Sequence, residues 1–273
     1  MGGRSSRSSA ANPFRKERIQ AGCVALMIQL YYTDVSPFFS LDMKSIAPAC
    51  FHKLSAERAR KTLRFRRTED KVRSLFSELL LNHALLENGA ADSFFGLGSK
   101  LKTGTHGKPY IEGDTNAAFN ISHSGKYVVL TYASSCVGVD IEELIRFSSA
   151  ESILNSFPPQ EKRRLEMYPA CQRTEQITRF WTLKESYIKY LGCGLFLSFS
   201  EFSLAKLIDS SGPDRTVRSV CDVEDKGPVF FHTQKLDPDY YLSVCTAKEE
   251  PISLIQVPAE SLWYQFLFEQ TQA

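Results

Sequence analysis

The chain has 273 residues, of which 43% are hydrophobic and 12% aromatic, and its formal net charge is +2. This composition can fill one large packed domain or two small ones. The near-neutral charge excludes a bulk electrostatic attraction to nucleic acid, so any basic site must arise from local clustering.

The cysteines and the hydropathy also limit the class of protein. Seven scattered cysteines with no Cys-x-x-Cys pair argue against a disulfide framework and a zinc site, and they predict a reducing, cytoplasmic compartment. No apolar run reaches the roughly 20 residues that a membrane span needs. We therefore expect no membrane span.

Residues 1–20 are small, polar and basic, and we expect them to form a disordered tail. Two targeting alternatives remain open. Gly2 with Ser6 fits the myristoylation pattern, and an Arg- and Ser-rich, acid-poor opening is typical of transit peptides.

In the first half of the chain, local signals predict strands mixed with helices. Ser55 and Thr68 are suitable helix N-caps, and Asn88-Gly89 is suited to end the second helix. The expected elements are a buried strand at 22–32, helices at 56–65 and 69–87, a loop at 92–117, and strands at 119–122 and 127–133.

The second half repeats these signals. Pro158-Pro159 favours a helix start, Pro169 an interruption, and Gly192 a helix end. The expected elements are a strand at 137–142, helices at 160–167 and 174–191, and strands at 200–204, 228–234, 240–246 and 252–257.

Both halves therefore share one rhythm: a short basic helix, a long amphipathic helix, then strands. The pattern predicts an α+β protein with an internal duplication. Its halves would be residues 21–134 and 135–258, followed by a C-terminal tail at 259–273.

Two acidic residues share one face of the strand Gly138-Val-Asp-Ile-Glu142. Side chains two apart in a strand point the same way, so Asp140 and Glu142 would repel each other while Val139 and Ile141 face the core. A hard cation such as Mg²⁺ would relieve that repulsion. Alternatively, the acidic residues simply leave the strand into solvent.

A polar turn lies upstream, in Phe119-Asn-Ile-Ser-His-Ser-Gly125. The Ser122–His123 pair, together with Ser124, offers hydroxyl and imidazole donors beside a glycine, which suits the binding of phosphate oxygens. The pair also resembles a nucleophile with its base, but no Gly-x-Ser-x-Gly elbow surrounds it. A purely structural histidine is the other interpretation.

Cations cluster in the two predicted helices at 56–65 and 69–87. Arg58 and Lys61 lie three residues apart on one face, and the intervening turn can bring Arg73 to meet them. A solvated face is one interpretation. Few acidic residues neutralise the cluster, which favours a polyanion or a multiply phosphorylated ligand.

The predicted helix around Trp181 carries Lys184, Glu185 and Lys189. Glu185 and Lys189 are one turn apart, as in many solvent-facing pairs. Taken with the acidic strand, the polar turn and the cations, these residues form the set that phosphoryl transfer requires, namely positioning and charge neutralisation.

Four motifs occur in a characteristic order: Gly107-Lys-Pro109, Phe119-Asn-Ile-Ser-His-Ser124, Gly138-Val-Asp-Ile-Glu142 and Trp181-x-x-Lys-Glu-Ser-Tyr-x-Lys189. Together they resemble the Sfp-type 4′-phosphopantetheinyl transferase family. The resemblance implies transfer of the phosphopantetheine arm of coenzyme A to a serine of an acyl or peptidyl carrier protein, releasing adenosine 3′,5′-bisphosphate. The implied fold is a monomeric pair of pseudo-twofold α+β halves, with coenzyme A in the cleft between them.

The resemblance also implies roles for individual residues. Asp140, Glu142 and Glu185 would hold Mg²⁺, and Glu185 would deprotonate the carrier serine, directly or through a metal-bound water. Lys189 would neutralise the transferring phosphoryl group. The coenzyme A contacts would come from Arg58, Lys61, Arg73, Lys108, Ser122, His123, Lys184 and Lys189.

The residues alone leave other classes open. A Mg²⁺-dependent phosphohydrolase or nuclease would use the same carboxylates and cations with water as the nucleophile. A catalytically silent module would use the basic helices to hold an acidic partner.

Overall fold

The computed structural model describes residues 27–42, 51–95, 101–104, 107–113, 118–145, 147–208, 217–222 and 227–268. The expected tail at 1–20 lies outside these residues. Its two targeting alternatives lie there as well. Within the described residues the fold is mixed α+β, as predicted.

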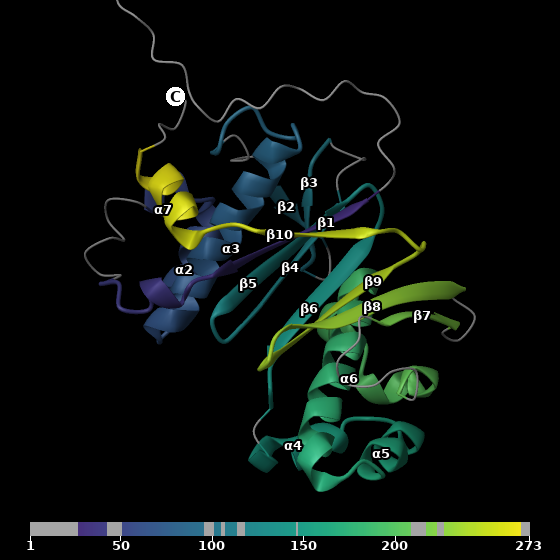
Figure 1. Ribbon diagram of the computed structural model, residues 1–273. Coiled ribbons are helices and arrows are strands. Elements are labelled where there is room, and N and C mark those ends of the chain that lie inside the picture. Colours follow the sequence, from purple (N-terminus) through teal and green to yellow (C-terminus); the bar gives the residue numbers. More distant parts are fainter. Residues whose placement is uncertain are drawn as a thin grey trace, which may run out of the picture.

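The first layer is a four-stranded sheet covered by a long helix (Figure 1). Its strand order is β10-β1-β5-β4, with every pair antiparallel except β1 with β10. The strands are β1 (Ile28–Asp34), β4 (Ala118–Ser124), β5 (Tyr127–Ala133) and β10 (Ile252–Gln256). Helix α3 (Thr68–Glu87) packs on this sheet, and α2 (Ala56–Arg64) packs on α3.

The second layer repeats the arrangement. Its strand order is β6-β9-β8-β7, all antiparallel, and α6 (Ala170–Leu191) packs on β6 and β9. The strands are β6 (Val137–Glu143), β7 (Val217–Asp222), β8 (Pro228–Asp237) and β9 (Tyr240–Thr246). Helices α4 (Phe147–Leu154) and α5 (Pro159–Glu166) flank α6, at the lower end of Figure 1.

Short elements fill the connections within each layer. They are the 3-10 turns Ser36–Phe38, Phe51–Lys53, Gly194–Phe196, Phe199–Glu201 and Ala205–Leu207, and the two-stranded ribbon of β2 (Leu101–Thr103) and β3 (Pro109–Ile111). The ribbon lies inside the stretch predicted to be a loop.

Local signals place most helix ends correctly. The Ser55 hydroxyl accepts a hydrogen bond from the Arg58 backbone N–H and caps α2, as predicted. Gly192 ends α6 with φ +70°, the left-handed conformation that glycine favours. Thr68 differs from its predicted role: it is the first residue of α3, whose N-cap is Arg67 without a side-chain bond.

Two further predictions are wrong. The predicted strand at 200–204 is replaced by the 3-10 turns Phe199–Glu201 and Ala205–Leu207, and Phe202 and Leu204, between the two turns, are buried in the core of the second layer. Helix α6 begins at Ala170, directly after Pro169, and not at Thr174.

The C-terminal residues also correct the predicted domain boundaries. Strand β10 pairs with β1, and α7 (Ala259–Phe268) packs on α3 with Leu262 and Phe266 fully buried. Residues 252–268 therefore complete the first layer, whereas the sequence placed them in the second half and in a tail. The pairing joins residues more than 200 positions apart, which no local pattern encodes.

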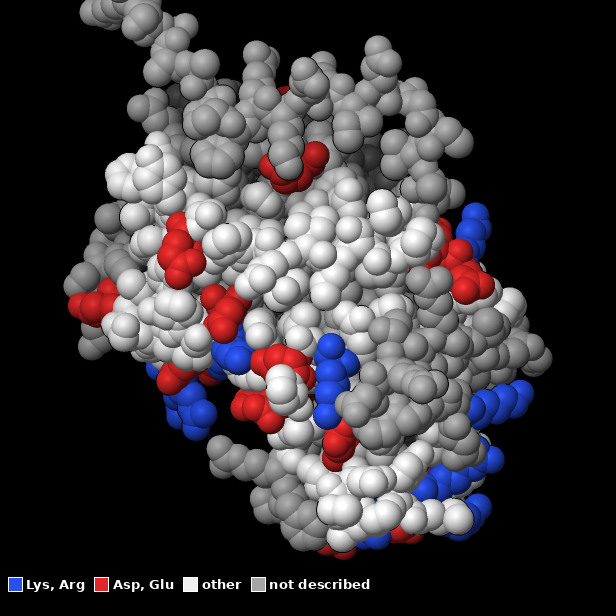
Figure 2. Space-filling view, viewed as in Figure 1, with Lys and Arg blue, Asp and Glu red and all other residues white. Residues whose placement is uncertain are grey.

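The surface charge is mixed. Figure 2 shows acidic and basic side chains interleaved across the middle of the face viewed in Figure 1, as the small net charge leads one to expect. No helix in the described part of the chain is both long enough and apolar enough to span a membrane.

Candidate active site

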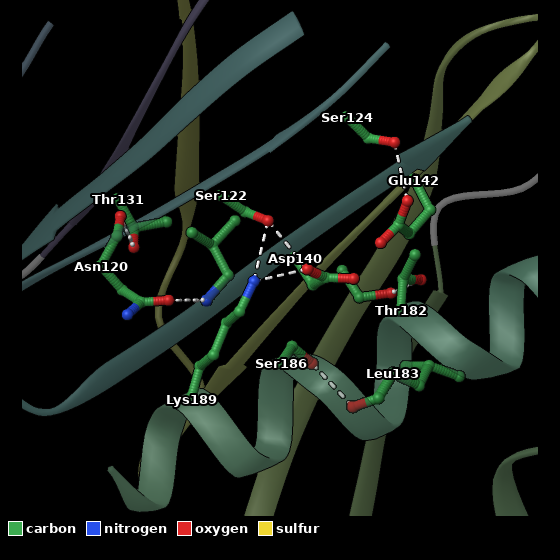
Figure 3. Close-up of polar contacts among 12 residues, drawn as sticks. Asn120, Ser122, Ser124, Thr131, Asp140, Glu142, Thr182, Leu183, Ser186 and Lys189 are labelled. Carbon is green, nitrogen blue, oxygen red and sulfur yellow. Dashed lines mark hydrogen bonds and ion pairs between the residues drawn. The ribbon is translucent and has the colours of Figure 1, made fainter. Parts of the chain in front are cut away.

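The two layers meet along β4 and β6, which lie side by side. Alternate residues of β4 reach across to β6 through their side chains (Figure 3). The Asn120 Oδ1 atom accepts the Val139 backbone N–H at 2.8 Å, Ser122 donates to Asp140, and Ser124 donates to Glu142. Side chains two apart share a strand face, so the two-residue step on both strands fixes which residues of β4 face which residues of β6. We call this contact between β4 and β6 the seam.

Close packing of α6 on β6 brings the helix to this seam. A Cβ atom on Gly138 would lie 2.1 Å from the Ser186 carbonyl oxygen and 2.3 Å from the Tyr190 backbone nitrogen. Only glycine avoids that overlap with the helix backbone. Gly138 thus allows Lys189, on α6, to reach Asp140, on β6.

Asp140 is buried, with 2% of its surface exposed. Its Oδ1 atom accepts hydrogen bonds from the Ser122 hydroxyl at 2.8 Å and from Lys189 Nζ at 2.5 Å. Its Oδ2 atom is buried without a hydrogen-bond partner. Burial raises the pKa of Asp140, against the opposing effects of Lys189 and Ser122.

Glu142 and Glu185 interact electrostatically with Asp140 and with each other. Burial and the Asp140 charge raise the pKa of Glu142 to about 7, with a smaller contribution from Glu185 and opposing effects of Ser124 and Lys189. Burial and Asp140 likewise raise the pKa of Glu185 to about 7. The structure thus brings the three predicted carboxylates together, at a free-energy cost in the absence of a neutralising cation.

Positive groups gather beside the seam, around His123. Its side chain has contact with solvent, but desolvation by the surrounding protein and the charges of nearby cations lower its pKa to about 4. The cations are Arg73, Lys189, Lys61 and Arg58, in decreasing order of effect. The structure therefore assembles five of the predicted coenzyme A contacts, from α2, α3, β4 and α6.

Each arginine in this group also has a protein partner. Arg58 Nε lies 3.5 Å from Glu78 Oε2. Arg73 forms an ion pair with Asp70 and donates to the Gly125 carbonyl oxygen at 2.7 Å. These contacts orient both guanidinium groups before any ligand binds.

The position of Lys184 contradicts the prediction that this residue contacts coenzyme A. Its side chain is completely buried, 2.8 Å from Glu161 Oε2, among the rings of four phenylalanines of the second layer. It lies five residues from Lys189, which is about 140° around the helix. Lys184 therefore faces the core and offers no surface to a bound ligand.

Lys108 lies at the C-terminal end of α6. Its ammonium donates to the carbonyl oxygens of Val137 at 3.1 Å, Lys189 at 2.8 Å and Tyr190 at 3.2 Å. A lysine in this position satisfies the unpaired carbonyls of the last helical turn. The structure shows it as a helix cap; its predicted contact with coenzyme A stays a prediction.

In the described residues, no three His, Cys, Asp or Glu side chains form a ready-made metal cluster. Asp140, Glu142 and Glu185 nevertheless suit Mg²⁺, which usually takes one or two protein carboxylates and completes its shell with water and substrate oxygens. The buried, unpartnered Oδ2 of Asp140 is the atom such an ion would satisfy.

Two residues of the seam were not recognised from the sequence as partners of β6: Asn120 was not singled out, and Ser124 was named only as a donor to phosphate oxygens. Asn120 and Ser124 flank Ser122 at the same two-residue step and make the same kind of contact to β6. The alternation along 119–124 could have revealed them. Their role was not predicted because the sequence does not show that β4 lies beside β6.

Comparisons with known proteins give one family. The model described as "4'-phosphopantetheinyl transferase superfamily" matches residues 136–245, and the one described as "4'-phosphopantetheinyl transferase, N-terminal" matches residues 45–135. A Bacillus subtilis 4'-phosphopantetheinyl transferase is 32% identical over 194 residues, covering 71% of this chain and 82% of the relative.

Other relatives extend the match. 4'-Phosphopantetheinyl transferase Sfp of Bacillus subtilis strain 168 is 30% identical over 210 residues, 77% of this chain and 89% of that protein. The human L-aminoadipate-semialdehyde dehydrogenase-phosphopantetheinyl transferase is 28% identical over 178 residues, 59% of this chain and 57% of that protein. None of these matches favours the phosphohydrolase alternative.

Proposed function

Since this chain belongs to the 4′-phosphopantetheinyl transferase superfamily and transfers phosphopantetheine to carrier proteins, we propose which of its residues perform the transfer. The donor is coenzyme A and the acceptor is a serine hydroxyl of an acyl or peptidyl carrier domain. The observation that carries the proposal is Asp140, a buried carboxylate with one oxygen held by Ser122 and Lys189 and the other without a partner.

The cations beside the seam bind the phosphates of coenzyme A. Burial, together with the nearby charges of Arg73, Lys189, Lys61 and Arg58, lowers the pKa of the His123 imidazole to about 4. At pH 7 the imidazole is therefore neutral and acts as an N–H donor, whereas the cations supply the charge. The Ser122 hydroxyl, on the same strand, donates its proton to Asp140, so its predicted contact with coenzyme A stays a prediction.

Asp140, Glu142 and Glu185 would hold Mg²⁺. When bound, the ion neutralises charge on the pyrophosphate. Lys189, which already contacts Asp140 Oδ1 at 2.5 Å, provides a further positive charge next to the transferring phosphoryl group. Charge neutralisation is the main requirement of phosphoryl transfer, because the protein has little covalent chemistry to perform.

Glu185 accepts the proton of the carrier serine. Burial and the Asp140 charge raise its pKa to about 7 in the metal-free protein, so this carboxylate accepts a proton more readily there than an ordinary glutamate. The serine oxygen then bonds to the phosphorus next to the pantetheine, and adenosine 3′,5′-bisphosphate leaves. The proton passes to Glu185 directly or through an intervening water.

The partners are carrier domains of fatty acid, polyketide or non-ribosomal peptide synthases. We place the enzyme in the cytoplasm, in agreement with the free thiols of Cys136, Cys171, Cys193 and Cys245 in the described residues. Because one chain supplies both layers of the seam, it can act as a monomer.

Intact-protein mass spectrometry of an apo carrier domain tests the proposal. With enzyme, coenzyme A and Mg²⁺, we expect the carrier mass to increase by one phosphopantetheine group, and EDTA to abolish the increase. Coenzyme A cleavage at the same rate without a carrier would overturn the proposal in favour of a hydrolase.

A further inference from the structure

The Ser124 hydroxyl makes two hydrogen bonds of opposite sense. Its Oγ accepts the Glu143 backbone N–H at 3.2 Å and donates to Glu142 Oε2 at 2.7 Å. A serine hydroxyl has one proton. With its acceptor side held by a backbone amide, that proton is directed at Glu142.

Ser122, two residues earlier, follows the same pattern. Its Oγ accepts from Lys189 Nζ at 2.8 Å and donates to Asp140 Oδ1 at 2.8 Å. The two hydroxyls of β4 therefore hold the two carboxylates of β6 in matching fashion, one oxygen each (Figure 3). The second oxygen of Asp140, Oδ2, is buried without a hydrogen-bond partner.

The turn after Ser124 is held by both layers. Gly125 has φ +50°, and a Cβ there would lie 1.9 Å from Tyr240 Oη, so only glycine fits. Its carbonyl oxygen accepts from Arg73. Lys126 donates its backbone N–H to Tyr240 Oη at 3.1 Å, and its ammonium lies 2.9 Å from Asp237 Oδ2. Ser124 is thus attached to a fixed segment.

Glu142 needs such an anchor. It is half-buried at the end of β6, and the nearby charges of Asp140 and Glu185 repel it. Without a directed donor, its side chain would lower its energy by rotating away from those charges into solvent. A hydrogen bond to an ionised carboxylate is among the stronger ones in proteins.

We propose that Ser124 is a positioning residue of this transferase: its hydroxyl holds Glu142 beside Asp140 and so fixes the second carboxylate of the magnesium site. The inference rests on the proposed function. Groups that orient metal ligands typically contribute about 10- to 100-fold to metal affinity.

Metal binding by the full-length protein tests the inference, with Mn²⁺ as the probe and electron paramagnetic resonance reporting free Mn²⁺. We expect Ser124→Ala to weaken Mn²⁺ binding by about 10-fold or more, and to raise the Mg²⁺ concentration for half-maximal transfer in parallel. Ser124→Thr keeps the hydroxyl and should bind Mn²⁺ as the wild type does.

Ser124→Cys is the second variant, since it keeps the volume of the side chain with only a weak donor. We expect it to bind Mn²⁺ as weakly as Ser124→Ala. Ser36→Ala is the matched control: Ser36 Oγ also donates to a carboxylate, Asp34 Oδ1, at 2.6 Å, but on an exposed turn of the first layer. Its Mn²⁺ affinity should equal that of the wild type.

The outcomes distinguish a failure of this inference from a failure of the proposed magnesium site. If wild-type protein transfers phosphopantetheine and binds Mn²⁺, but Ser124→Ala and Ser124→Cys bind it equally well, the inference is wrong and the proposed function stands. If the wild type binds no Mn²⁺ and transfers without divalent ions, the magnesium site itself is wrong, and the inference falls with it.

Discussion

Helix α6 carries two lysine–carboxylate pairs that differ in almost every physical respect. Lys184 and Glu161 are both 0% exposed and 2.8 Å apart. Glu161 Oε1 also accepts the Leu204 backbone N–H, and Lys184 also donates to the Phe202 carbonyl oxygen. This pair is closed: both of its charged groups are satisfied by protein.

The pair of Lys189 and Asp140 is open. Lys189 is 26% exposed, and Asp140 keeps a buried oxygen without a partner. Two further carboxylates with pKa values of about 7 lie close by. The comparison teaches that a structural ion pair is complete within the fold, whereas the pair at the proposed active site is completed by a ligand.

The largest expected effect is on activity at the open pair. Asp140→Asn keeps the shape of the side chain but removes a charged metal ligand, and we expect transfer to fall by at least about 10³-fold because phosphate charge goes uncompensated. Initial rates of carrier modification measure this. Folding should be retained, since neutralising a buried carboxylate removes its desolvation cost. A variant with more than a tenth of wild-type activity would contradict the role of Asp140.

The next effect is on stability at the closed pair. Lys184→Met leaves Glu161 buried without its cation, which typically costs about 3–5 kcal/mol of unfolding free energy. Urea denaturation measures this. The double variant Lys184→Met with Glu161→Gln should recover much of the loss.

Lys189→Met is the matched comparison on the same helix. Its side chain is partly exposed, so we expect a smaller change in unfolding free energy but a much larger loss of transfer rate. Should Lys184→Met reduce the rate per folded molecule as strongly as Lys189→Met does, the distinction between the closed and the open pair would fail.

A smaller effect concerns the metal-free protein. Because the folded pKa of Glu185 is about 7, above its ordinary 4.5, the folded state binds the proton more tightly than the unfolded state. Stability therefore falls as the pH rises from 4.5 through 7. Glu185→Gln should raise the melting temperature in EDTA at pH 8 by about 1–3 °C, allowing for partial solvent exposure, with no gain at pH 4. An equal gain at both pH values would contradict this.

The smallest effect is a shift in one titration. His123 should titrate at a pKa of about 4 in the free enzyme, observable by NMR of the imidazole. Adenosine 3′,5′-bisphosphate would place negative charge beside the ring and raise that pKa toward its ordinary value of 6.5. His83, on the far part of α3, should titrate identically with and without the nucleotide.

Much of the site could be predicted because its signals are local. Asp140 and Glu142 share a face through the two-residue period of a strand, and Glu185 and Lys189 share one through the turn of a helix. Glycines at 138, 125 and 192 mark a close approach, a tight turn and a helix end. The sequence assigned both Lys184 and Lys189 to the ligand, although the helical period places Lys184 on the apolar face, four residues after Phe180 and three before Tyr187.

The sequence by itself determined helices α2, α3, α5 and α6, most of the strands, the α+β class and most of the residues with the right chemistry, but it missed α4 and α7. The features that it determined depend on interactions within a few positions along the chain. The tertiary structure alone decided that β10 and α7 return to the first layer, that Lys184 faces Glu161, and that Ser124 meets Glu142. Each of these contacts joins segments 18 or more residues apart. Which residues meet in them follows from the packing of whole layers, and no single stretch of sequence encodes that packing.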